Sequence, residues 1–204
     1  MQSLCIYQAI FTMVKPNQLI DDDDLIRLFE IILLSILNSS NCDTLDVGYS
    51  IALFRAVNYW CIKLDEIVAL NAAAESSSSV ANLLSDQSGW FTKLMLFVWS
   101  HFNHNIDVIR ASSLQNYKLM LKVASSVKGS HHVDRFYQDE LEKCLSASWQ
   151  MNAKFSVLIC LLESGIKATR IIELNPQIAC ELINAITERS TACLVADLYS
   201  RLFK

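Results

Sequence analysis

Glycine and proline are scarce: the 204 residues of this chain include only 4 Gly and 2 Pro. A sheet protein needs many tight turns, and such turns rely on Gly, Pro and Asn at backbone angles that other residues adopt less readily. Hydrophobic residues make up 52% of the chain and charged residues only 19%. This composition argues against an all-β fold and favours long helices joined by short corners.

Long apolar runs are lacking as well. A helix needs about 20 predominantly apolar residues to span a bilayer. The strongest candidate, residues 25–37, is shorter than that and is interrupted by Arg27 and Glu30. No basic segment precedes the first apolar residues, so we expect no signal peptide. The sequence therefore predicts a protein without a membrane partner.

Paired cysteine spacing is also absent. The cysteines are odd in number and scattered, so we expect them to be reduced, small apolar core residues and not a disulfide framework. A cytoplasmic or nuclear location follows from that expectation. The seven are Cys5, Cys42, Cys61, Cys144, Cys160, Cys180 and Cys193.

The motifs of common enzyme classes are missing. No Gly-rich loop follows a strand, which argues against a nucleotide or S-adenosylmethionine cradle of the usual kind, and there is no G-x-S-x-G elbow. The acidic run 21–24 invites comparison with helical enzymes whose carboxylates bind Mg²⁺. No second acidic cluster follows it, and favourable interaction with a helix dipole explains the run. We expect no catalytic residue, no bound metal and no cofactor.

Apolar residues recur at helical spacing along most of the chain. Consecutive helices in antiparallel pairs predict an all-α fold, an α-solenoid of HEAT- or armadillo-like helix pairs at roughly 40–47 residues per repeat. Residues 1–204 are then a single helical-repeat region, and a globular helical bundle is the alternative. Residues 129–132 are expected to form a polar corner. Helices are expected over residues 3–14, 21–37, 45–70, 90–102, 134–144, 147–163, 167–174 and 191–203, with two more that begin near Asn105 and at Asn175-Pro176.

The segment 99–110 predicts the end of one helix, a short polar corner and the start of the next. Asp107 near the start of the second helix can cap it, and Arg110 one turn later can reach neighbouring carbonyls or acids. Large aromatics are usually buried, so Trp90, Trp99 and Phe102 are expected to pack in the core and not to form a base-stacking platform.

The histidines raise the alternative of a metal site, formed by His101 with His104, or by His131 and His132 with Cys144. Zinc sites generally use closely spaced pairs of Cys or His. These candidate ligands are sparse, so a corner or capping role is favoured for them.

Basic residues gather in the middle of an otherwise acidic chain. Acidic side chains predominate before residue 93, whereas Lys and Arg outnumber Asp and Glu between residues 93 and 135. A locally basic segment is a weak indication of a polyanion partner, and a solvated helix face is the alternative. The candidate RNA-phosphate contacts are Lys118, Lys122, Lys128, His131, His132 and Arg135.

The pattern Trp99-x-His101-Phe102-x-His104, followed by Ile106-Asp107-x-x-Arg110, resembles a segment of the THADA family. The resemblance extends over about residues 90–129, and Asn105 stands where family members often have proline. The family comprises large cytosolic helical-repeat proteins that act as non-catalytic partners of a tRNA ribose 2′-O-methyltransferase. Its members are far longer than this chain, so we expect a part of a longer protein.

The resemblance implies a function. The chain would be a non-catalytic, cytoplasmic adaptor that assists an FtsJ-like tRNA 2′-O-methyltransferase at the anticodon loop. The basic residues between 110 and 135 would contact tRNA phosphates, and an apolar face would bind the enzyme. A generic HEAT-like scaffold that binds only protein is the second hypothesis, and an enzyme of helical fold is the third.

Overall fold

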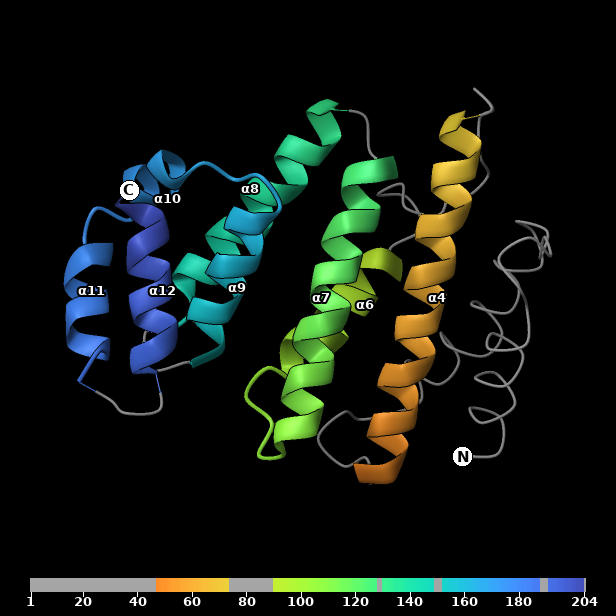
Figure 1. The fold of residues 1–204 in the computed structure, drawn as a ribbon, viewed down its shortest axis with the longest axis horizontal. Helices are drawn as coiled ribbons and strands as arrows, with labels where there is room; N and C mark the ends of the chain where they lie inside the picture. Colours follow the sequence, from red (N-terminus) through yellow and green to blue (C-terminus); the bar gives the residue numbers. More distant parts are fainter. Residues whose placement is uncertain (1–46, 74–89, 128–129, 149–151, 188–190, 204) are drawn as a thin grey trace. The chain divides into compact units, whose positions relative to one another are not determined.

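The computed structural model describes residues 47–73, 90–127, 130–148, 152–187 and 191–203. Within these ranges the chain forms helices and no strand, which confirms the all-α prediction. None of the described helices is long and apolar enough to cross a membrane. The solenoid arrangement and the single helical-repeat region stay predictions. The helices are α4 (Val47–Ala73), α6 (Trp90–Ser100), α7 (Asp107–Val127), α8 (Ser130–Ser146), α9 (Asn152–Glu163), α10 (Ala168–Leu174), α11 (Ile178–Ala185) and α12 (Ala192–Leu202) (Figure 1).

The chain divides into two compact units, one ending at Gly129 and the other beginning at Ser130. In the first unit the long helix α4 packs along α7, and α6 packs on α7 as well (Figure 1). The apolar stripes of α4 and α7 face each other, and burial of these stripes is the main driving force for the packing. The largest fully buried side chains there include Trp60, Phe54 and Tyr117.

In the second unit α9 packs between α8 and α12, while α10 and α11 each contact α12. Helix α9 carries apolar residues around most of its circumference, as expected for a helix with neighbours on several sides. Phe155 and Leu158 are buried on it, and Leu198 of α12 is fully buried. This core holds five short helices together.

The observed helix boundaries correct several predictions. The expected helices over 3–14 and 21–37 lie outside the described residues. The expected polar corner at 129–132 is wrong, because α8 begins at Ser130 and contains both histidines. A run of polar residues does not distinguish a loop from the exposed face of a helix. Pro176 is not the first helical residue either, since α11 begins at Ile178, after a turn in which the Asn175 side-chain oxygen accepts the Gln177 N–H at 3.2 Å.

The cysteines within the described ranges fall into two groups, while Cys5 and Cys42 lie outside those ranges. Cys61, Cys144 and Cys160 are buried with free thiols, as predicted, whereas Cys180 and Cys193 are exposed, so the prediction of core burial is wrong for these two. They lie on α11 and α12 outside the stripes that these helices bury. Burial raises the pKa of the Cys61 and Cys144 thiols well above the ordinary value, because the thiolate would lose its hydration.

Thiol labelling is expected to separate these groups. When the native chain is treated with N-ethylmaleimide at neutral pH, the peptides that contain Cys180 and Cys193 should be alkylated. Those with Cys61, Cys144 and Cys160 should react only in denaturant, because the reagent cannot reach a buried thiol. Peptide mass spectrometry reads out each site. Alkylation of native Cys61 at the rate of Cys193 would contradict this packing.

Candidate functional site

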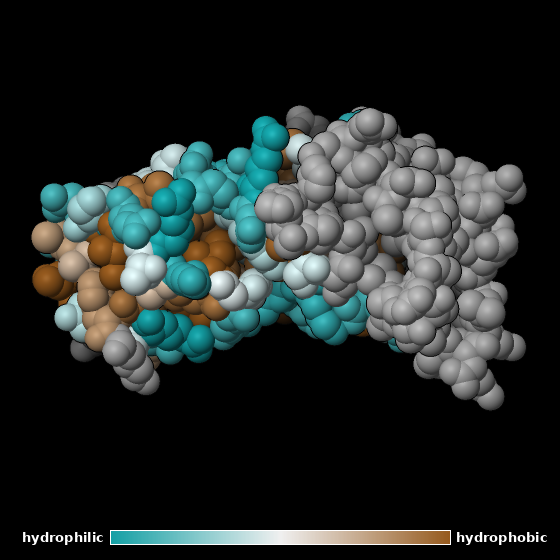
Figure 2. All heavy atoms as spheres, turned by 90° about the horizontal axis from the view of Figure 1, so that it is seen from above, coloured by the Kyte–Doolittle hydropathy of each residue, from teal (hydrophilic) through white to brown (hydrophobic). Residues whose placement is uncertain are grey.

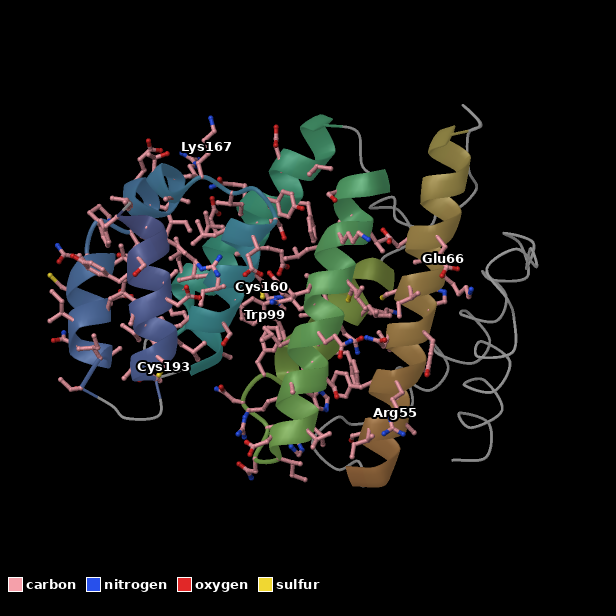
Figure 3. All side chains as sticks on the ribbon, viewed as in Figure 1. Arg55, Glu66, Trp99, Cys160, Lys167 and Cys193 are labelled. Carbon is pink, nitrogen blue, oxygen red and sulfur yellow. The ribbon has the colours of Figure 1, made fainter. Side chains whose placement is uncertain are left out.

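The end of α6 and the following helix α7 are joined by an aromatic cluster. Trp99 packs edge-on against Tyr117 of α7, with ring centroids 6.2 Å apart. Phe102 makes a similar edge-on contact with Tyr117 at 5.5 Å and with Trp99 at 5.1 Å. All three side chains are buried, and Figure 3 labels Trp99 beside α7. Trp99 and Phe102 therefore contribute to the core, and their rings are not open for stacking on a base. Trp90 begins α6.

His101 is anchored in the same core. Its Nδ1 lies 2.8 Å from the Phe97 carbonyl oxygen, and its ring meets that of Phe54 edge-on at a centroid distance of 5.1 Å. A carbonyl oxygen only accepts hydrogen bonds, so Nδ1 carries the proton and donates. The side chain, only 2% exposed, thereby ties the last turn of α6 to α4.

The polar part of the corner is closed by its own residues. His104 Nδ1 accepts the Ile106 N–H at 3.1 Å, and its ring stacks on that of His101 at 5.9 Å. Arg110 donates to the His104 carbonyl oxygen and to the Asp107 carboxylate. Arg110 thus reaches one carbonyl and one acid, while Asp107 stands in the first turn of α7, where a negative charge favours the helix.

This arrangement makes the corner a connector between helices. Each of the two histidine rings uses its Nδ1 in a hydrogen bond within the corner. Among the described residues there is no group of three or more His, Cys, Asp or Glu placed to hold a metal ion. The residues of the motif fix the angle and register of α6 against α7.

Buried polar residues on α7 were not anticipated from the sequence. Ser113 donates to the Val98 carbonyl oxygen at 2.6 Å. Asn116 is fully buried and donates to the Phe54 carbonyl oxygen at 2.9 Å. The signal was present, because positions 113 and 116 continue the helical spacing of Ile109 and Met120 on the buried face. A polar residue in such a register predicts a hydrogen bond to a neighbouring helix.

The candidate phosphate contacts are distributed over both units. Lys118 and Lys122 lie one turn apart on the exposed surface of α7. Lys122 donates to the Asp65 carboxylate of α4, so part of its charge is already neutralised. Arg135 is exposed on α8, in the second unit. Lys128 and the side chains of His131 and His132 lie outside what the structure describes.

A polar groove lies between α4 and α7, and no pattern in the sequence had indicated it. Its volume is about 450 Å³, within the range of about 300–1,000 Å³ that is usual for ligand sites. It is lined by Phe54, Arg55, Asn58, Tyr59, Ser112, Gln115 and Asn116.

The second unit contains a buried charge. Lys154 on α9 is only 1% exposed. Its ammonium donates to the carbonyl oxygens of Leu145 and Ala147 and to the Glu181 carboxylate, at 3.3, 3.1 and 3.2 Å. Asn175 donates to the other Glu181 oxygen at 3.2 Å. Because every ammonium proton has an acceptor within the unit, Lys154 links the end of α8, α9 and α11 as a structural cation.

Similarity to known proteins extends over much of the chain. It is 23% identical over 171 residues to the tRNA (32-2′-O)-methyltransferase regulator THADA of Gallus gallus, covering 83% of this chain and 8% of that protein. The human THADA protein is 25% identical over 138 residues, and that of Canis lupus familiaris is 24% identical over 143 residues. Each of these two alignments covers 67% of this chain and 7% of the relative.

The chain thus spans less than a tenth of the length of the relatives it matches. No protein-family model matches it. No solved structure matches it either. The resemblance to THADA proteins that the motif at residues 99–110 predicts is confirmed, and it extends over two thirds of the chain or more.

Proposed function

We propose that this chain is a non-catalytic helical part of a regulator of a tRNA ribose 2′-O-methyltransferase. The observation that carries the proposal is the similarity to THADA proteins, whose name describes them as regulators of methylation at tRNA position 32. The motif that first indicated the family forms a connector between helices, which suits a scaffold better than a reaction centre.

The proposed mechanism is that of an adaptor. Residues 1–204 would form one helical-repeat region of a longer, cytoplasmic protein, with HEAT- or armadillo-like helix pairs stacked into a solenoid. Such a scaffold binds an FtsJ-like methyltransferase and the tRNA together, which raises the effective concentration of one near the other. No methyl transfer occurs on the scaffold itself.

Exposed hydrophobic side chains in the second unit are the candidate contacts for the enzyme. Four large hydrophobic side chains on or at the C-terminal ends of α11 and α12 are between 43% and 61% exposed. They are Ile183, Ile186, Tyr199 and Phe203. Figure 2 shows hydrophobic residues reaching the surface of this unit among hydrophilic ones. The Tyr199 and Phe203 rings adjoin each other at a centroid distance of 4.7 Å, and contiguous exposed apolar surface favours a protein partner.

Co-purification tests the adaptor role. The chain is expected to co-elute with an FtsJ-like tRNA 2′-O-methyltransferase and to increase its activity on the tRNA anticodon loop, without activity of its own. Lys118→Glu should weaken tRNA binding and lower the slope of log affinity against log salt by about 0.7–0.9, the contribution of one phosphate contact. Filter binding over a salt series measures the tRNA affinity and its salt slope.

Lys122 is not the residue to change, because its ammonium already pairs with a carboxylate of α4. Lys122→Glu would place a second carboxylate beside Asp65 and could disturb the packing of α4 on α7. Lys93→Glu, an exposed lysine of α6, is the matched control and should leave tRNA binding unchanged. A folded chain that ignores both the enzyme and tRNA would refute the adaptor role and favour the generic protein scaffold.

A further inference from the structure

Arg55 gives the groove between α4 and α7 a positive charge. It lies exposed on α4 (Figure 3), and no Asp or Glu is among the described residues that line the groove. Within the described part of the chain, no carboxylate pairs with the Arg55 guanidinium and no hydrogen bond holds it. A guanidinium is charged at every physiological pH and presents a planar set of donors that matches a phosphate. The groove therefore favours an anionic ligand.

The floor of the groove is fixed before any ligand arrives. Asn116 donates to the Phe54 carbonyl oxygen at 2.9 Å and accepts from the Asn58 amide at 3.1 Å. Asn116 is fully buried, and neither its side-chain amide nor that of Asn58 can rotate without breaking a hydrogen bond between α4 and α7. The Asn58 side chain is thereby held with its amide oxygen as the remaining acceptor.

The rim supplies polar groups of several kinds. Tyr59 on α4 contributes an aromatic ring and a hydroxyl, Ser112 on α7 a hydroxyl, and Gln115 on α7 an amide with donors and an acceptor. None of these three side chains has a hydrogen-bond partner within the ranges that the structure covers. One cation, the amides of Asn58 and Gln115, two hydroxyls and an aromatic ring around a small groove match the parts of a nucleotide.

A second groove differs from this one in its charge. It lies in the second unit, has a volume of about 580 Å³, and is lined by Lys167 and Arg170 but also by Asp134 and Glu173. Arg170 donates to Gln138 at 3.1 Å and to Glu173 at 3.3 Å, so its donors are engaged within the unit. The charges that line this groove cancel, and its Arg170 guanidinium is already paired.

We propose that the groove between α4 and α7 binds one nucleotide of single-stranded RNA. The phosphate contacts Arg55, the base lies against Tyr59, and the amides of Asn58 and Gln115 contact the base edge. Unpaired bases are recognised in this way, by an aromatic ring and side-chain amides beside a cation that holds the backbone. The site deepens the proposed function by naming unpaired RNA as the ligand, yet it is argued from the groove alone and is separate from Lys118.

Fluorescence anisotropy with the full chain tests the site. The probe is a short fluorescein-labelled single-stranded RNA of mixed sequence, titrated at low and moderate salt without any methyltransferase. Arg55→Ala should weaken binding about tenfold, as expected for the loss of a charge-assisted hydrogen-bond pair. It should also lower the salt slope by about 0.7, the value for one phosphate contact on a single strand. Arg55→Lys should retain the salt slope but bind more weakly, because a lysine cannot hold phosphate through two parallel bonds.

Two further variants make the result specific. Gln115→Ala should weaken binding without changing the salt slope, because it removes an uncharged contact. Arg170→Ala removes the same charge from the neutral groove and should bind like the unchanged chain. Circular dichroism checks that each variant is folded.

Three results would overturn the proposal. These are no RNA binding by the unchanged chain at low salt, equal losses for Arg55→Ala and Arg170→Ala, or Arg55-dependent binding of a poly-glutamate peptide with none of RNA. Because no methyltransferase is present, failure here leaves the co-purification experiment untouched. Equally, a chain that binds RNA through Arg55 but ignores the enzyme would keep the groove and refute the adaptor role.

Discussion

Lys154→Ala is expected to lower the free energy of unfolding of the second unit by about 3 kcal/mol. Removing one partner of a buried ion pair typically costs about 3–5 kcal/mol, because the other charge is left without compensation. The low end applies here, since the Glu181 side chain is 27% exposed and water can partly solvate its charge. The loss also leaves the carbonyl oxygens of Leu145 and Ala147 without their donor.

Urea unfolding followed by circular dichroism measures the loss, and amide hydrogen exchange locates it. Exchange should accelerate in α8, α9 and α11 and stay unchanged in α4 and α7. Lys167→Ala removes an exposed lysine of the same unit and is expected to change stability by less than about 0.5 kcal/mol. A Lys154→Ala chain as stable as this control would mean that the ammonium is not buried as described.

A double variant separates charge from packing. Lys154→Met combined with Glu181→Gln removes both charges, keeps most of the side-chain volume and leaves an amide for Asn175. It should recover part of the loss, because a buried pair replaced by neutral groups of similar size costs little. Recovery by the double variant but not by Lys154→Met alone would identify the uncompensated carboxylate as the main cause.

Lys154 shows why part of this structure escaped sequence reasoning. A lone lysine in an apolar helix is usually assigned to the surface, since lysine is almost never fully buried unless paired. Its partner Glu181 lies 27 positions away on another helix, and no local pattern joins the two. The pairing depends on tertiary packing and not on local sequence. The same holds for the groove beside Arg55, which exists only because α4 and α7 pack side by side.

The helices themselves could be predicted, because periodicity is a local property. Tyr117, Leu121 and Ala124 recur at helical spacing along α7, and all three are buried. The corner chemistry of Asp107 and Arg110 was also local, since its contacts span only a few residues. Helix boundaries were harder to predict. Residues 130–132 are polar enough for a loop, and no neighbouring residue indicates that they begin a helix.

Trp99→Ala is expected to have a comparable or larger effect in the first unit. Replacing a buried Trp by Ala costs about 3–5 kcal/mol, because transfer free energy is lost and a cavity remains. The edge-on contacts with Phe102 and Tyr117 add to the loss. Leu96→Ala on the same helix is the matched control: Leu96 is 54% exposed, so its loss should be within about 0.5–1 kcal/mol.

This comparison decides what the family motif does. If Trp99 is a core residue, then Trp99→Ala should destabilise the first unit, accelerate amide exchange in α6 and α7, and reduce RNA or enzyme binding only in proportion to the unfolded fraction. Binding measured at a temperature where the variant remains folded should then match the unchanged chain. A folded, stable Trp99→Ala chain that no longer binds RNA would instead make Trp99 a recognition residue, and the aromatic cluster with Phe102 and Tyr117 would have to open in the complex.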